Sequence, residues 1–261
     1  MRKLLAVLLA CLLASPAGAA ISFIGTAGGT AINAGSVTVT LPGGMASNDL
    51  IVVAFGVGDD DFTQPTLAIT TAGYTEVTSS TCSADGGTGG DGNLAVFYKF
   101  HNGSDTNVVT TAAGTGTDSS VAVRVLVLRG VATAGAGGPF DTTFTQATGT
   151  SGGDPDPPSI DHTGTAGVWT VIAGAVGNAA AITLTGPTNY TTNFGNSVGD
   201  DTFDVSTGLG YRTNPADPED PGVMTDSGAG VAWCAVTMAL KEAPACTPDL
   251  SGLLGVSRGC P

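Results

Sequence analysis

The chain has 261 residues and a formal net charge of −14 at pH 7, yet only 11% of its residues are charged and 42% are hydrophobic. Disordered chains combine low hydrophobicity with high net charge, so this composition indicates a folded protein. The excess of acidic residues argues against binding to nucleic acid or to anionic lipid surfaces.

The first residues have the pattern of a secretory signal peptide at 1–19. Arg2 and Lys3 are basic, residues 4–14 are apolar, and small residues at 17–19 suit cleavage after Ala19. The apolar segment is too short to span a bilayer, and no later segment approaches the roughly 18 apolar residues of a transmembrane helix. Cleavage would leave six basic and 22 acidic residues, a net charge of −16. We expect a secreted protein, extracellular or periplasmic, with a virion surface as the alternative.

An apolar run at 50–57 ends in the acidic triplet Asp59, Asp60 and Asp61. Calcium takes six to eight oxygen ligands, and aspartates on a turn supply them, so this triplet is the candidate metal site. The alternative is a solvated acidic loop. No EF-hand or nonapeptide calcium repeat accompanies the triplet, which favours the loop.

Two later runs, at 94–100 and 121–128, alternate residue by residue as strands do. The second run is apolar on both faces, so we expect it to be buried on both, with Arg124 requiring a partner. Gly-rich turns separate such runs and no amphipathic helix is evident. The sequence therefore predicts an all-β fold, an antiparallel β-sandwich spanning residues 20–243.

The chain also reads as two sequence-related halves, at about 21–145 and 158–241. Four landmarks recur in the same order with similar steps. We expect the halves to complete one sandwich, with residues 130–167 as a long surface connection. The matched landmarks are Val57-Gly58 with Val176-Gly177, Tyr74-Thr75 with Tyr190-Thr191, Tyr98-Lys99 with Tyr211-Arg212, and Leu128-Arg129 with Leu240-Lys241. We interpret Tyr74 and Tyr190 as structural residues of each half.

Catalytic motifs are weak. Residues 195–199 match G-x-S-x-G around Ser197, but no helix pattern follows, and both histidines precede the serine instead of following it. His101 and His162 stand beside turn residues, where a histidine is usually a solvated side chain. No pair of carboxylates is singled out for glycosidase chemistry. We expect no enzymatic activity and no cofactor other than a possible calcium ion.

Removal of the signal peptide takes Cys11 and leaves Cys82, Cys234, Cys246 and Cys260. An even number in an exported protein fits two disulfides, although four cysteines allow three pairings. Cys246 and Cys260 bracket a short segment, so we expect them to close the C-terminal tail, residues 244–261. Cys82 with Cys234 then follows by elimination.

Several short motifs resemble a family of Gly/Thr-rich β-sandwich proteins found among tailed-phage tail and structural proteins and related exported bacterial proteins. The motifs are "LRGV" at 128–131, "PFD" at 139–141, "DLIVV" at 49–53, "GYT" at 73–75 and "EDPG" at 219–222. The resemblance covers about residues 21–241. It implies a jelly-roll-like sandwich with a structural or surface-binding role and no catalytic residues.

The sequence thus predicts a non-enzymatic structural or adhesion module on a cell or virion surface. The alternative is a carbohydrate-binding, lectin-like module, which calcium could assist. We expect a protein or glycan partner to contact the segments at 59–66, 82–93 and 193–204, and self-association into a homo-oligomer is left open.

Overall fold

The structure is a computed structural model. It describes the following residues: 20–32, 34–58, 65–77, 82–84, 90–113, 119–133, 138–150, 153–163, 167–178, 182–196, 204–228 and 232–244. Side chains are described for all of these except 178 and 192–196. Regular secondary structure in this part of the chain is entirely β, which confirms the predicted fold class. No helix in the described residues is long and apolar enough to cross a membrane.

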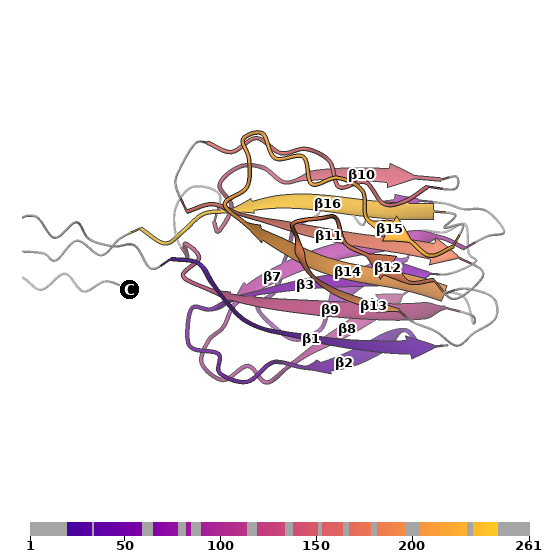
Figure 1. Cartoon of the computed structure of the whole chain (residues 1–261). Helices are drawn as coiled ribbons and strands as arrows, with labels where there is room; N and C mark the ends of the chain where they lie inside the picture. Colours follow the sequence, from indigo (N-terminus) through magenta and orange to yellow (C-terminus); the bar gives the residue numbers. More distant parts are fainter. Residues whose placement is uncertain are drawn as a thin grey trace, which may run out of the picture.

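Two large antiparallel sheets form the centre of the molecule (Figure 1). The first large sheet has the order β1(Ser22–Ile32), β9(Ser120–Arg129), β3(Leu50–Gly58), β7(Gly92–Phe100), β5(Thr75–Glu76), and β6(Cys82–Ala84) also pairs with β7. The second large sheet has the order β10(Thr145–Gly149), β16(Ala232–Leu240), β11(Trp169–Asn178), β14(Asp204–Thr213), β13(Thr191–Asn196).

Two smaller sheets cover the outer faces of the large ones. The first consists of β2(Ser36–Thr40), β8(Asn107–Ala113) and β4(Thr66–Ile69), and the second of β12(Leu184–Thr185) and β15(Thr225–Asp226). Separate apolar clusters fill the space between the large sheets, between the first large sheet and β2-β8-β4, and beneath β12 and β15. The sandwich is therefore layered on both outer sides, which explains why its central strands are apolar on both faces.

Strand β9 shows this two-sided burial directly. Val121, Val123, Val125 and Val127 pack toward β2-β8-β4, whereas Ala122, Leu126 and Leu128 pack between the large sheets. The predicted alternation is thereby confirmed. Arg124 shares the inner face and lies over Gly28 of β1, where its Nη1 donates to the carbonyl oxygen of Val123 at 2.9 Å. Its Nε is buried without a hydrogen-bond partner among the described residues.

The two large sheets have the same connectivity. In each, an edge strand (β1 or β10) is followed by the last strand of the half, the long apolar strand and the tyrosine-bearing strand. All four sequence landmarks fall at corresponding places: near the ends of β3 and β11, at the starts of β5 and β13, on β7 and β14, and at the ends of β9 and β16. This equivalence supports a duplicated unit, although the sequence relationship of the halves stays a prediction.

Strand β10 corrects one expectation. Residues 130–167 are not only a surface connection, because Thr145–Gly149 pairs with β16 along its whole length and forms the edge of the second large sheet. Its sequence, TQATG, is short and polar, and its residues are only half-buried or exposed. An edge strand buries few side chains, so it lacks the apolar run by which the other long strands can be recognised.

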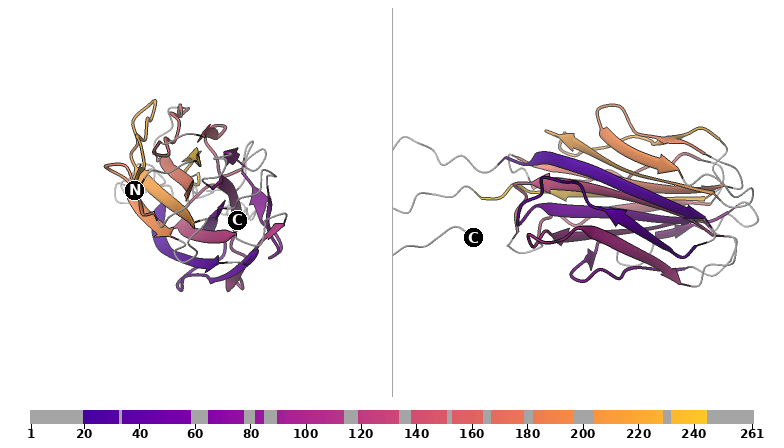
Figure 2. Two further views of the ribbon diagram at one scale, coloured as in Figure 1. Left: turned by 90° about the vertical axis from the view of Figure 1, so that its right-hand side faces the viewer. Right: turned by 90° about the horizontal axis from the view of Figure 1, so that it is seen from below.

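The gap between the large sheets narrows toward the end at which β3 and β11 finish. A Cβ atom added to Gly92 would collide with the carbonyl oxygen of Ala232, and one added to Gly177 with that of Asp91. At the opposite end the gap is filled by aromatic rings instead. These rings are Tyr98, Phe100, Phe140, Phe144, Trp169 and Tyr211. The first described residues, before β1, and the last, after β16, both lie at this wider end (Figures 1 and 2).

We expect Gly177→Ala to destabilise the protein by about 2–3 kcal/mol, because the new methyl group meets backbone atoms that cannot rotate away. Gly43→Ala is the matched control, since nothing lies within 4 Å of a Cβ at Gly43. Its effect should stay within about 0.5 kcal/mol. Urea denaturation of both variants provides the comparison, and equal stabilities would contradict close contact between the sheets.

Candidate functional site

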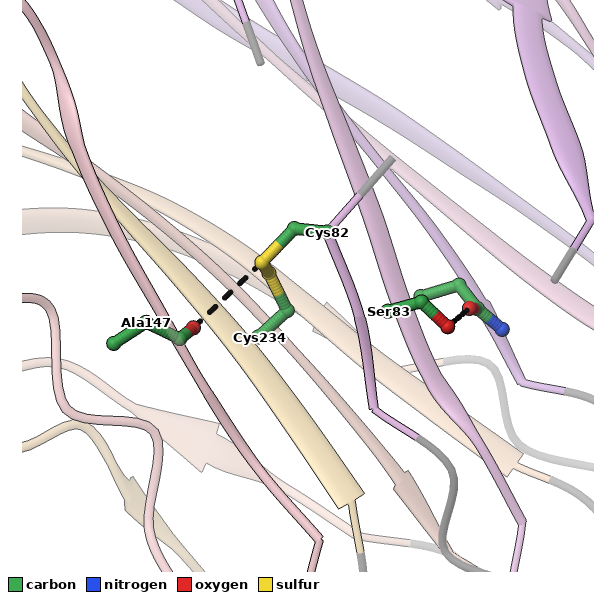
Figure 3. The surroundings of a disulfide bond; sticks show 5 residues. Cys82, Ser83, Ala147 and Cys234 are labelled. Atoms are coloured by element: carbon green, nitrogen blue, oxygen red, sulfur yellow. Dashed lines mark hydrogen bonds between the residues drawn. A yellow bond between two sulfur atoms is a disulfide. The ribbon is translucent and has the colours of Figure 1, made fainter. Parts of the chain in front are cut away.

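The disulfide Cys82–Cys234 closes one side of the sandwich. It joins β6, at the edge of the first large sheet, to β16 in the second (Figure 3). The Sγ atom of Cys82 lies 3.6 Å from the carbonyl oxygen of Ala147 on β10. A disulfide sulfur carries no proton, so this approach is a packing contact. The pairing predicted by elimination is present, and both cysteines are buried.

A pocket opens on the same side of the sandwich, farther toward the wide end. Its volume is about 470 Å³, which falls within the range of small-molecule sites. It lies between the edge strand β5 and the segment that leads into β10. The lining residues are Thr75, Glu76, Val77, Tyr98, Phe140, Asp141, Thr142, Thr143 and Phe144.

The wall formed by residues 140–144 is tied to the second large sheet. Phe140 forms a β-bridge with Leu240, and the Asp141 amide donates to the carbonyl oxygen of Ala239 at 2.8 Å. The Asp141 carboxylate accepts hydrogen bonds from the amide of Thr163 at 2.7 Å and from its hydroxyl at 2.6 Å. These contacts hold the wall in place, so the pocket is largely preformed.

Aromatic rings and hydroxyl groups share the lining. The rings of Tyr98 and Phe140 meet edge to face, with centroids 5.3 Å apart. Among the described residues, the hydroxyls of Tyr98, Thr142 and Thr143 have no hydrogen-bond partner in the protein. Glu76 and Asp141 add negative charge, and none of the described lining residues is basic. The arrangement suits a ligand that combines an apolar face with hydroxyl groups.

A separate polar cluster surrounds Lys99 in the first half. Its Nζ donates to Asp105 Oδ1 at 2.6 Å and to the carbonyl oxygen of Ala72 at 2.9 Å, and it lies 5.5 Å from the centre of the Tyr74 ring. Burial, together with the charge of Asp105, raises the pKa of Tyr74 well above its ordinary value. Every charge is paired within the cluster, which indicates a structural role, as predicted for Tyr74.

The expectation that His101 is a solvated turn residue is wrong. Its side chain is 5% exposed, and its Nδ1 lies 3.1 Å from Asp105 Oδ2. The same oxygen accepts the amide of Asn102 at 3.0 Å. The turn at residues 101–105 folds back, which places the Asp105 carboxylate against the His101 ring. His162 is half-buried instead, with its Nε2 3.5 Å from Thr170 Oγ1.

The second half repeats the arrangement around Glu219, which is fully buried. Its carboxylate accepts from Arg212 Nη1 at 2.8 and 3.1 Å, from the Tyr190 hydroxyl at 2.8 Å and from the Ala216 amide at 2.8 Å. Tyr190 and Arg212 correspond to Tyr74 and Lys99. Burial, reinforced by the hydrogen bond to Glu219, raises the pKa of Tyr190, which keeps its hydroxyl a donor.

Acid should weaken the fold through Asp49 and Asp105. Burial alone would raise the pKa of each, but for Asp49 the hydrogen bonds from Arg129 and Ala46 outweigh it. For Asp105 the hydrogen bonds from Lys99 and Asn102 do the same. Both carboxyls therefore have a pKa below their ordinary 3.8. The ionised forms stabilise the folded state above that pH, and this contribution is lost as pH falls through the lowered values.

We expect the free energy of unfolding to fall below about pH 4 and to fall less steeply in the Asp49→Asn/Asp105→Asn double variant. Urea denaturation at pH 5 and at pH 3 measures the difference. Equal pH dependence in the two proteins would show that these carboxylates do not cause the acid sensitivity.

Several predicted site residues lie outside the described residues: Asp59, Asp60, Asp61, Ser197, Cys246 and Cys260. The metal site and the tail disulfide therefore stay predictions. In the described part of the chain, no group of three or more His, Cys, Asp or Glu residues could hold a metal ion. Two of the three expected contact segments come close at their described residues, because a Cβ on Gly58, just before the first, would lie 2.9 Å from the carbonyl oxygen of Asp204, the last residue of the third. Asp91 of the second segment instead lies against Gly177 of β11.

The pocket is the feature that sequence reasoning missed. Its residues come from three places, at 75–77, at 98 and at 140–144, and no motif connects them. One signal was present, since "PFDTTF" at 139–144 places two phenylalanines and two threonines in a segment otherwise rich in glycine.

Comparison of the chain with protein-family models, with curated proteins and with solved structures finds no match. The class of the protein is therefore defined by its own fold and site. It is an all-β sandwich with a disulfide between its two large sheets and a pocket at the sheet edge.

Proposed function

We propose that the protein is a non-enzymatic, exported β-sandwich that acts as a structural or adhesion module on a cell or virion surface. The observation that supports this most is the position of the two ends of the described chain. The described chain enters and leaves at the wide end, while β3, β11 and β1 finish at the opposite end (Figure 1). A module attached through its termini would present the far end to a partner, which is where the predicted contact segments begin.

The buried disulfide and the paired charged clusters add to this proposal. A disulfide suits an oxidising compartment, as an extracellular or periplasmic protein requires. The clusters around Lys99 and Glu219 have their charges satisfied by neighbouring groups. These groups support the fold and offer no free acid or base to a substrate.

Oriented attachment tests the adhesion proposal. Beads would carry the mature protein through a biotin tag after Pro261, or through an acceptor peptide inserted between β8 and β9 at the opposite end. We expect adhesion to immobilised glycans or to bacterial cells only from the C-terminal attachment. Adhesion in neither orientation, or substrate turnover in a broad hydrolase screen, would contradict the proposal.

A second candidate function is carbohydrate binding, and the pocket at the sheet edge is the observation that favours it. Aromatic rings beside unpaired hydroxyls suit a sugar, which has apolar C–H faces and many hydroxyl groups. Calcium assistance is a separate part of this proposal. It depends on residues 59–61, which follow directly after the far end of β3.

A further inference from the structure

We propose that the pocket between β5 and residues 140–144 binds a neutral oligosaccharide, and that it does so without calcium. This inference rests on the second candidate function and assigns it a site. It differs from the adhesion proposal, because the pocket lies on the side of the sandwich near the wide end and not at the far end.

The pocket lies at the edge of the wide end, where aromatic rings occupy the space between the two large sheets. Tyr98 and Phe140 meet edge to face, and Tyr98 meets Phe100 in the same way at 6.4 Å. These rings, with Phe144, pack against the core between the sheets. Nearer the far end, the disulfide Cys82–Cys234 ties the edges together. Three of these rings, Tyr98, Phe140 and Phe144, form part of the pocket lining.

The hydrogen-bonding groups of the pocket determine the class of ligand. Hydroxyls of Tyr98, Thr142 and Thr143 can each both donate and accept, and the described residues supply none of them with a partner. A hydroxyl-rich ligand can match such groups in either direction. A lining that combines aromatic rings with hydroxyl-bearing residues is complementary to a sugar ring, which has polar edges and apolar faces.

Charge then distinguishes neutral from acidic sugars. Glu76 and Asp141 line the pocket, and the lining residues that the structure describes include no lysine, arginine or histidine. The chain as a whole is strongly acidic, with a formal net charge of −14. A uronic acid would bring a third carboxylate into this field without a cation to pair it, so acidic sugars should be excluded.

Position separates the pocket from the predicted calcium site. Tyr98 lies opposite Val52 on β3, whereas the triplet at 59–61 begins only after Gly58. Six residues of strand correspond to about 20 Å. The described strand thus ends well away from the position opposite Tyr98. We expect the pocket to hold a sugar ring without calcium, so removal of calcium should leave saccharide binding unchanged.

Calorimetric titration of the mature, oxidised protein tests the inference. The probes are chitohexaose and cellohexaose, with hexagalacturonate as the acidic counterpart, each with calcium and with EDTA. We expect at least one neutral hexasaccharide to bind equally well in both buffers, and hexagalacturonate to bind at least tenfold more weakly. Tighter binding of the acidic probe, or loss of binding in EDTA, would overturn the assignment.

Conservative variants test whether the saccharide binds in the pocket. Tyr98→Phe and Thr143→Val each remove one hydroxyl and keep the shape of the residue, so each should weaken binding about three- to tenfold. Tyr211→Phe and Thr148→Val make the same changes outside the pocket and should leave the affinity unaltered. Binding that all four variants leave intact would overturn the pocket but preserve carbohydrate binding as a function. No binding of any probe would remove both, while the oriented-bead experiment would still decide the adhesion proposal separately.

Discussion

Reduction of the Cys82–Cys234 disulfide should lower the free energy of unfolding by about 5 kcal/mol, because the bond spans 152 residues of the chain. Cross-linking such distant positions restricts the unfolded chain strongly. The bond also connects the two large sheets at the edge where the short strands β6 and β10 lie. Without the disulfide, no covalent bond would join the two sheets at this edge.

A Cys246→Ser/Cys260→Ser background isolates this effect, because it leaves Cys82 and Cys234 as the only cysteine pair of the mature chain. Oxidised and reduced samples of that protein then have identical sequences. Urea denaturation of both gives the contribution of the bond directly. A difference below about 1 kcal/mol would mean that the bond does not hold the sheets together in solution.

Glu219→Ala should destabilise the protein by about 3–5 kcal/mol. The substitution leaves the Arg212 guanidinium without its counter-ion and the Tyr190 hydroxyl without its acceptor, both in a partly buried site. It also removes the acceptor of the Ala216 amide. The backbone of Glu219 pairs in both directions with Ile160, so the segment over the second large sheet should loosen as well.

Asp220→Ala is the matched control, since its side chain is exposed and makes only a long contact of 3.4 Å to the Gly222 amide. Its effect should stay within about 0.5 kcal/mol. Glu219→Gln keeps an acceptor for Tyr190 and should therefore cost less than Glu219→Ala. Thermal and urea denaturation of the three variants would reveal the order. Equal stability of Glu219→Ala and Asp220→Ala would contradict a structural role for the buried carboxylate.

The main strands could be predicted because burial imposes a regular pattern on them. In β9 the alternating valines pack in one core and, Arg124 apart, the apolar residues between them pack in another. The landmarks Tyr98-Lys99 and Tyr211-Arg212 also occupy corresponding strands. Where a strand is long and central, its neighbours on both faces constrain its composition.

Other features depend on contacts that no local pattern records. Strand β10 is short, polar and at an edge, so its sequence resembles that of a loop. His101 is buried because Asp105 folds over it, and a histidine followed by an Asn-Gly-Ser turn gives little sign of this. The pocket joins Tyr98 to residues more than 40 positions later, and only the packing of one sheet edge against the other brings them together.

The most direct test of a binding module with a pocket at its sheet edge is amide chemical-shift mapping. The mature, oxidised, ¹⁵N-labelled protein would be titrated with chitohexaose and, separately, with cellohexaose. We predict that shifts concentrate at Thr75, Glu76, Tyr98 and residues 140–144. Shifts confined to the far end, around Gly58 and Gly177, or no shifts with either sugar, would contradict the assignment of the pocket.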